Sequence, residues 1–125
     1  MSEYDAFLAG KRPRAESCGI EVGLEALHPA LFPFQRDIVR WALKKGRSAI
    51  FADTGLGKGL IALEWARHVH QQTGRDVLIL APLAVSYQMA REACKLDLLP
   101  TVCRTARDLS AGTIRSFDGA TMGGK

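Results

Sequence analysis

Hydrophobic positions recur with helical spacing in three stretches of the chain, residues 34–46, 57–74 and 84–96. In the first stretch the apolar stripe falls at i, i+4, i+5, i+8 and i+9 and consists of Phe34, Ile38, Val39, Ala42 and Leu43. The first two stretches end at Gly46 and Gly74, and the end of a helix favours a residue that tolerates the left-handed conformation. We therefore predict three helices, with a short fourth one over Tyr4–Ala9.

Between these helices lie short, continuously apolar runs bounded by polar residues, as expected of strands buried on both faces. They are "SAIFAD" at 48–53, "DVLILAP" at 76–82 and "TVCR" at 101–104, with a weaker candidate at Thr113–Phe117. Because helices and strands alternate, the pattern predicts an α/β fold with a parallel sheet of three or four strands and flanking helices.

The length of 125 residues predicts one domain. We expect an irregular N-terminal arm at 1–33, a core at 34–104 and an irregular tail at 105–125. A hydrophobic share of 47% with 24% charged residues is that of a soluble globular protein, and the net charge of +4 is compatible with a polyanionic partner without establishing one.

No apolar run approaches the roughly 20 residues of a membrane span, and the first residues do not resemble a signal peptide. We therefore expect a cytoplasmic protein without a membrane partner. Three cysteines form no disulfide framework, and they share no zinc-ligand spacing with the three histidines. We expect reduced, buried thiols, imidazoles at the surface, and no metal site built from cysteine and histidine.

The stretch "FADTGLGKGL" at 51–60 joins a predicted strand to a predicted helix, which is where a phosphate-binding loop belongs. Its glycines let the backbone turn tightly and direct amide hydrogens at an anion. Lys58 would then contact the β- and γ-phosphates. The alternative is a glycine-rich turn with an exposed lysine. A dinucleotide fingerprint fits less well, because Leu60 stands where its third glycine would be.

Three stretches, "FPFQRDIVRWAL", "ADTGLGKG" and "VLILAPLAVSYQMAREA", resemble the Q motif, motif I and motif Ia of superfamily 2 and Swi/Snf-type helicases, with phage and prophage helicase-like proteins closest in look. The resemblance covers about residues 4–99 and implies the first RecA-like, ATP-binding domain of a motor acting on nucleic acid, DNA in particular. It implies that ATP contacts Gln35, Thr54, Gly55, Leu56, Gly57, Lys58 and Gly59. It also implies nucleic-acid contacts at Pro82, Leu83, Ser86 and Gln88.

The chain departs from this family where hydrolysis would be carried out. Gly59 replaces the usual serine or threonine, whose hydroxyl binds Mg²⁺, so a magnesium site is doubtful. No Asp-Glu pair occurs in the sequence, and no arginine finger or second RecA-like domain follows. The run at 113–121 resembles the segment after the Asp-Glu box, which leaves internal deletion and truncation both open. We assign no catalytic residue and predict weak ATP binding without turnover.

Three interpretations of this pattern remain open. The chain is an ATP-binding fragment of a helicase or translocase, a non-catalytic module that binds nucleotide or DNA, or a remnant without function. A second chain that supplies the missing motor motifs would favour the first. P-loop kinases explain the sequence less well, because they leave Gln35 and the segment at Pro82 without a role.

Overall fold

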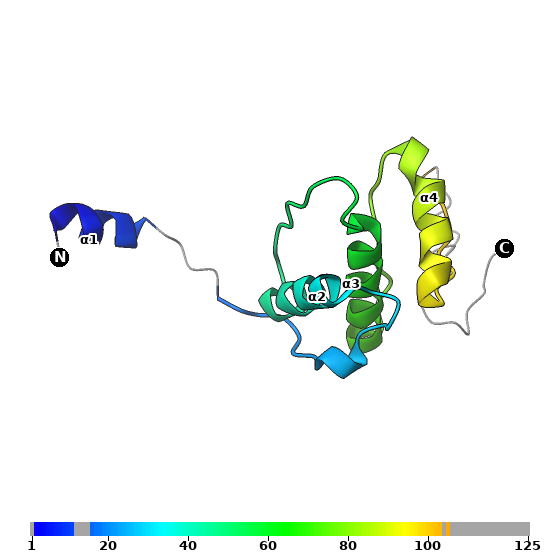
Figure 1. Ribbon diagram of the computed structural model, residues 1–125, viewed down its shortest axis with the longest axis horizontal. Coiled ribbons are helices and arrows are strands. Elements are labelled where there is room, and N and C mark those ends of the chain that lie inside the picture. Colours follow the sequence, from blue (N-terminus) through cyan, green and yellow to red (C-terminus); the bar gives the residue numbers. More distant parts are fainter. Residues whose placement is uncertain (1, 12–15, 104, 106–125) are drawn as a thin grey trace.

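The computed structural model describes residues 2–11, 16–103 and 105, and these residues form a helical structure (Figure 1). In this described part, four α-helices follow one another: α1 (Glu3–Gly10), α2 (Pro33–Lys45), α3 (Lys58–Thr73) and α4 (Leu83–Ala93). Two short 3₁₀-helices are also present: η1 (Leu24–Ala26) lies between α1 and α2, and η2 (Cys94–Leu96) directly follows α4. Each helix predicted from the sequence is therefore present, with boundaries shifted by a few residues.

Helix α2 begins and ends where its sequence indicates. Pro33 occupies the first turn, where its missing N–H costs no hydrogen bond. Gly46 ends the helix with a φ of 81°, and its N–H donates to the Ala42 carbonyl at 3.0 Å. Of the predicted stripe, Val39, Ala42 and Leu43 are buried.

Helices α2 and α4 both pack against α3, with α2 crossing it and α4 lying alongside (Figure 1). A hydrophobic cluster between α3 and α4 consists of Leu31, Leu63, Ala66, Ala93, Leu96 and Leu98. A second cluster, between α2 and α3, consists of Leu27, Val39, Leu43 and Ile61. Helix α1 contacts none of the other helices. Thus α3 is the central element, and its N-terminal end carries the glycine-rich loop.

Part of the expected N-terminal arm belongs to this core. The Ile20 N–H donates to the Leu43 carbonyl at 2.7 Å, which fixes the chain against the end of α2. Leu27 and Leu31 are buried against the helices.

None of the described helices is long and apolar enough to cross a membrane.

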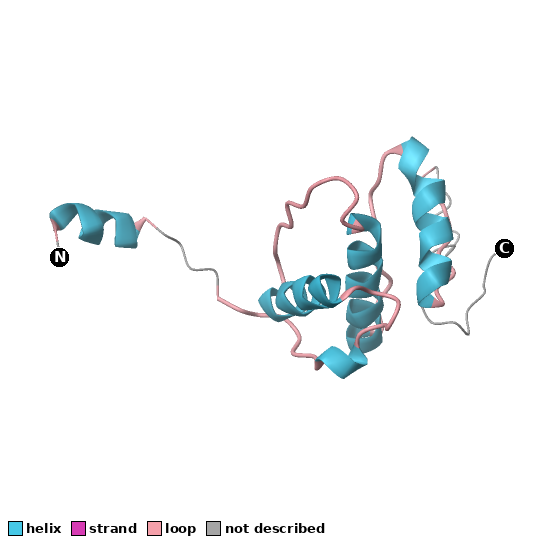
Figure 2. Cartoon of the chain, viewed as in Figure 1, coloured by secondary structure: helices cyan, strands magenta, loops and turns pink. Residues whose placement is uncertain are grey.

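The predicted parallel sheet is absent from the described residues, so the α/β assignment with three or four strands is wrong for this part of the chain (Figure 2). Residues 48–53, 76–82 and 101–103 run outside any helix without a ladder of hydrogen bonds. Residue 104 and the candidate strand at 113–117 lie outside the described residues.

The apolar runs fail as strands because a strand exists only when a neighbour pairs with its backbone. Residues 77–81 make no backbone hydrogen bond in the described structure. Phe51 is 97% exposed and Leu80 is 87% exposed, so neither run is covered on both faces. Hydrophobicity along the chain indicated burial for most of the α2 stripe, although Phe34 is 42% exposed. In the extended segments it did so for Val77 and Ile79, which pack against the core, but not for Phe51 and Leu80.

Candidate phosphate-binding site

The loop before α3 depends on two glycines in the left-handed region. Gly55 has a φ of 82°, and Gly57, the N-cap of α3, has a φ of 74° and a ψ of 40°. Residues with a β-carbon avoid this region at a cost of about 1–2 kcal/mol. The Asp53 carboxylate accepts a hydrogen bond from the Thr54 N–H at 2.8 Å and so fixes the entry to the turn. The loop therefore turns sharply and enters α3 at residue 58.

Lys58 is the first residue of α3, where the helix dipole disfavours a positive charge. Its ammonium group donates to the Ala52 carbonyl at 2.9 Å, across the base of the loop. The first turn of α3 contains no acidic residue, and no side chain caps it. The first amide hydrogens of a helix have no carbonyl partner within it. Amide hydrogens and an ammonium group therefore occupy the same end of α3.

Gln35 is buried and joins α2 to this loop. Its side-chain oxygen accepts from the Phe32 N–H at 2.9 Å, and its amide nitrogen donates to the Leu56 carbonyl at 3.0 Å. A β-carbon at Gly57 would overlap the same amide nitrogen. The structure thus brings Gln35 and the loop together, with the side-chain oxygen and one N–H of Gln35 bonded within the protein.

Gly59 lies in the first turn of α3 beside the Glu92 carboxylate of α4. A β-carbon at Gly59 would overlap Oε2 of Glu92, so a serine or threonine there would require Glu92 to move. A carboxylate oxygen is a ligand type that Mg²⁺ accepts. The described residues contain no group of three or more His, Cys, Asp or Glu placed to bind a metal. A single carboxylate beside the loop would therefore fit only a metal ion that is held mainly by phosphates and water.

The four residues expected to contact nucleic acid lie at the start of α4 and do not form one surface. Pro82 is the N-cap, and Leu83 begins the helix. The Ser86 hydroxyl donates to the Leu83 carbonyl at 2.8 Å, whereas the Gln88 amide donates to Glu92 at 3.3 Å. Ser86 and Gln88 are two positions apart in the sequence, which corresponds to a rotation of about 200° around the helix axis. Their side chains therefore point in nearly opposite directions.

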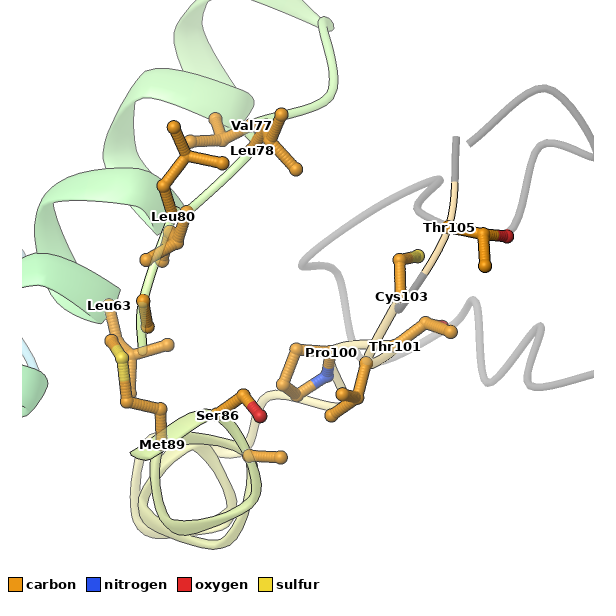
Figure 3. A pocket seen from close by; sticks show the side chains of 14 residues that line it. Leu63, Val77, Leu78, Leu80, Ser86, Met89, Pro100, Thr101, Cys103 and Thr105 are labelled. Atoms are coloured by element: carbon orange, nitrogen blue, oxygen red, sulfur yellow. The ribbon is translucent and has the colours of Figure 1, made fainter. Parts of the chain in front are cut away.

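A cavity of about 260 Å³ lies on the Ser86 side of α4 (Figure 3). Its walls are the extended segments 77–81 and 100–103, together with Leu63, Met89 and Thr105. No residue of the glycine-rich loop lines it. Most of these side chains are apolar and none carries a positive charge, although the hydroxyls of Ser86, Thr101 and Thr105 also line the cavity. The candidate phosphate site, with its ammonium group and helix amides, therefore lies elsewhere, at the N-terminal end of α3.

A buried polar network on α3 was not foreseen from the sequence. Glu64 is fully buried and accepts hydrogen bonds from Arg67 Nε at 2.9 Å, from the His28 N–H at 3.0 Å and from His68 Nε2 at 3.0 Å. Burial raises the pKa of Glu64, but bonds from His68, Arg67 and His28 outweigh it and bring this pKa to about 2. Arg67 also donates to the Ala26 carbonyl at 3.2 Å, so the network fastens η1 to α3.

The expectation of buried thiols and surface imidazoles is wrong. His68 is buried because Glu64, one turn earlier on α3, accepts its hydrogen bond. Cys18 and Cys94 are exposed, and Cys103 is partly buried beside the cavity. The signal for Glu64 and His68 was their i, i+4 spacing on the side of α3 that also carries Ile61.

Comparisons with protein families, curated proteins and solved structures found no match for this chain. The geometry of the loop, Lys58 and the side chains around them are therefore the features that indicate a function.

Proposed function

We propose that the chain binds the phosphate groups of a nucleoside triphosphate, ATP by the helicase resemblance, at loop 52–59. One observation carries the proposal: two left-handed glycines lead directly into an uncapped helix whose first residue is Lys58. A cation at this end of a helix is unfavourable unless an anion neutralises it. Phosphate oxygens would accept hydrogen bonds from the first amides of α3 and attract Lys58 away from the Ala52 carbonyl.

The proposed roles within the loop differ from residue to residue. Gly55 and Gly57 provide the turn, and the amide of Gly59 faces the anion from the helix. Thr54 and Leu56 contribute backbone groups, because the Thr54 side chain is directed at Asp53 and the Leu56 carbonyl is bonded to Gln35. Gln35 would hold the loop in shape beside the bound phosphates.

We infer binding without turnover, as a fragment of a helicase-type motor or as a non-catalytic nucleotide-binding module. Hydrolysis requires carboxylates that position a metal ion and water, together with an arginine from a second domain. The sequence contains no Asp-Glu pair, and Gly59 offers no hydroxyl to Mg²⁺. Glu92, which lies beside Gly59, is a carboxylate outside the loop that could replace this ligand. Nucleic acid, DNA in particular, and a second chain with the missing motifs are the proposed partners.

Thermal melting of the full chain with and without ATP tests this function. A ligand at 100 times its Kd stabilises the folded state by about 2.7 kcal/mol, which raises Tm by several degrees. We expect this increase in the parent chain and in Lys95→Ala, whose lysine is exposed on η2, but not in Lys58→Ala. An equal increase in all three proteins would refute binding at the loop.

Magnesium and turnover are tested with the same proteins. Adding Mg²⁺ should change the ATP-induced increase in Tm only slightly, because the hydroxyl ligand is absent. Phosphate release from ATP should stay at background. Release above background that disappears in Lys58→Ala would contradict binding without turnover while supporting the site itself.

A further inference from the structure

The exposed face of α2 carries a row of cations that the phosphate site does not use. Arg36, Arg40 and Lys44 follow one another at intervals of four residues, so they lie about 6 Å apart along one side of the helix. Lys45 and Arg47 add two further cations at and just beyond the C-terminal end of α2. Helix α2 packs against α3 (Figure 1), and its buried residues Val39, Ala42 and Leu43 lie on the other side of the helix from Arg40 and Lys44.

A row of exposed aromatic rings runs beside these cations. Phe34 is 42% exposed and Trp41 is 47% exposed, and they are seven positions apart, about 10 Å along the helix. Phe32, which is 65% exposed, stacks on Phe34 with ring centroids 6.2 Å apart and an interplanar angle of 10°. Grouped exposed apolar side chains, unlike single scattered ones, are a feature of interaction surfaces.

The charges on this face are strongly unbalanced. Beside the five cations, α2 itself carries one carboxylate, Asp37, and Glu21 pairs with Lys44 at 3.3 Å. Arg36 donates to the Leu31 carbonyl at 3.2 Å. In the described structure Arg40 and Lys45 have no ion pair. Most of the chain's net charge of +4 therefore lies on this face.

We propose that the outer face of α2 binds single-stranded nucleic acid. Bases would stack on Trp41 and Phe34, while phosphates contact Arg40 and its neighbours in the cation row, the combination found on single-strand binding surfaces. A duplex keeps its bases stacked inside and cannot offer them to the rings. An acidic peptide would use the cations but leave the aromatic row without a partner.

This surface gives the nucleic-acid partner in the proposed function a different location from the start of α4. It does not involve loop 52–59, so the inference rests on the proposed function only for the class of partner. Loss of ATP binding in Lys58→Ala and loss of nucleic-acid binding in an α2 variant are separate measurements. Failure of one leaves the other standing.

Fluorescence anisotropy of a labelled oligo(dT) with the full chain tests the inference. We expect Arg40→Glu to weaken binding at least tenfold and Trp41→Ala to weaken it about tenfold, the loss of one stacked base. Arg91→Glu, the same charge change on exposed α4, should change Kd less than twofold. Arg40→Ala should reduce the slope of log K against log salt by about 0.7, the contribution of one phosphate.

Three results would overturn the inference. The first is no binding of oligo(dT) by the parent chain at low salt, and the second is an equal loss in Arg91→Glu and Arg40→Glu, which would assign the binding to net charge alone. The third is binding of a duplex or of polyglutamate as tight as that of oligo(dT), with Trp41→Ala unchanged. Far-UV circular dichroism of each variant, with helix content equal to that of the parent, ensures that the loss reports on the surface.

Discussion

Replacing Gly57 by alanine should destabilise the protein more than the same replacement at Gly55, because only Gly57 lies against Gln35. Both glycines have a positive φ, 74° and 82°, so alanine costs about 1–2 kcal/mol of backbone strain at either position. Both replacements also restrict the unfolded chain equally. A β-carbon at Gly55 meets open space, whereas at Gly57 it would overlap the Gln35 amide nitrogen.

The additional cost at Gly57 follows from the buried Gln35 amide. Gln35 would have to move, which breaks its 3.0 Å hydrogen bond to the Leu56 carbonyl. A lost hydrogen bond costs about 1 kcal/mol, and a buried donor left without a partner costs about 1–3 kcal/mol. We therefore expect Gly57→Ala to lower the free energy of unfolding by about 2 kcal/mol more than Gly55→Ala does.

Urea titration followed by circular dichroism measures both free energies of unfolding. A double variant supplies a further control: once Gln35→Ala has removed the amide, Gly57→Ala should lose its additional cost. The two substitutions should then be less than additive by about 1–2 kcal/mol. Equal destabilisation by the two alanines, or full additivity with Gln35→Ala, would refute the contact between Gln35 and the loop as the cause.

Two further predictions concern the buried network and the unpaired segments. Glu64 has a pKa of about 2 in the folded state against 4.5 in the unfolded state, so its contribution of about 3 kcal/mol is present above pH 4.5 and is lost as the pH falls toward 2. Urea titrations between pH 2.5 and 7 should show this loss of unfolding free energy in the parent, and a weaker dependence on pH in Glu64→Gln. Identical pH dependence in the two proteins would exclude Glu64 as the source of the loss. The exposed segment around Leu80 should make the parent chain associate as its concentration rises, which sedimentation velocity measures. Leu80→Lys should reduce this association, because charge on an unpaired extended segment opposes intermolecular pairing, whereas Leu80→Val should not. A parent chain that does not associate, or association that is unchanged in Leu80→Lys, would contradict this prediction.

Helices were predictable because their determinants are local. The i to i+4 hydrogen bonds of α2 lie within one segment, and its apolar stripe, Pro33 and Gly46 can all be read from neighbouring residues. The same holds for α3, which ends at the predicted glycine, Gly74. The positive φ of Gly55 and Gly57 also agrees with the expectation of a tight glycine turn before α3.

Side-chain partners at long sequence distance were not predictable from these patterns. Gln35 bonds a carbonyl 21 residues further along the chain, and the His28 N–H bonds Glu64 over 36 residues. The spacing of residues along the chain does not indicate these hydrogen-bonded pairs, because they depend on how α2 and η1 pack against α3. The burial of His68 follows from the same network and could not be inferred from its polarity alone.

The sequence by itself determined the helices, their caps and the glycine-rich turn that leads into Lys58, since each depends on residues within a few positions of one another. Only the tertiary structure decided the outcome for the apolar runs, because a strand needs the backbone of a second segment and residues 77–81 have none in the described structure. The tertiary structure also decided which polar side chains are buried. Gln35 and Glu64 are buried because α2 and η1 pack against α3, and the same packing supplies their hydrogen-bond partners.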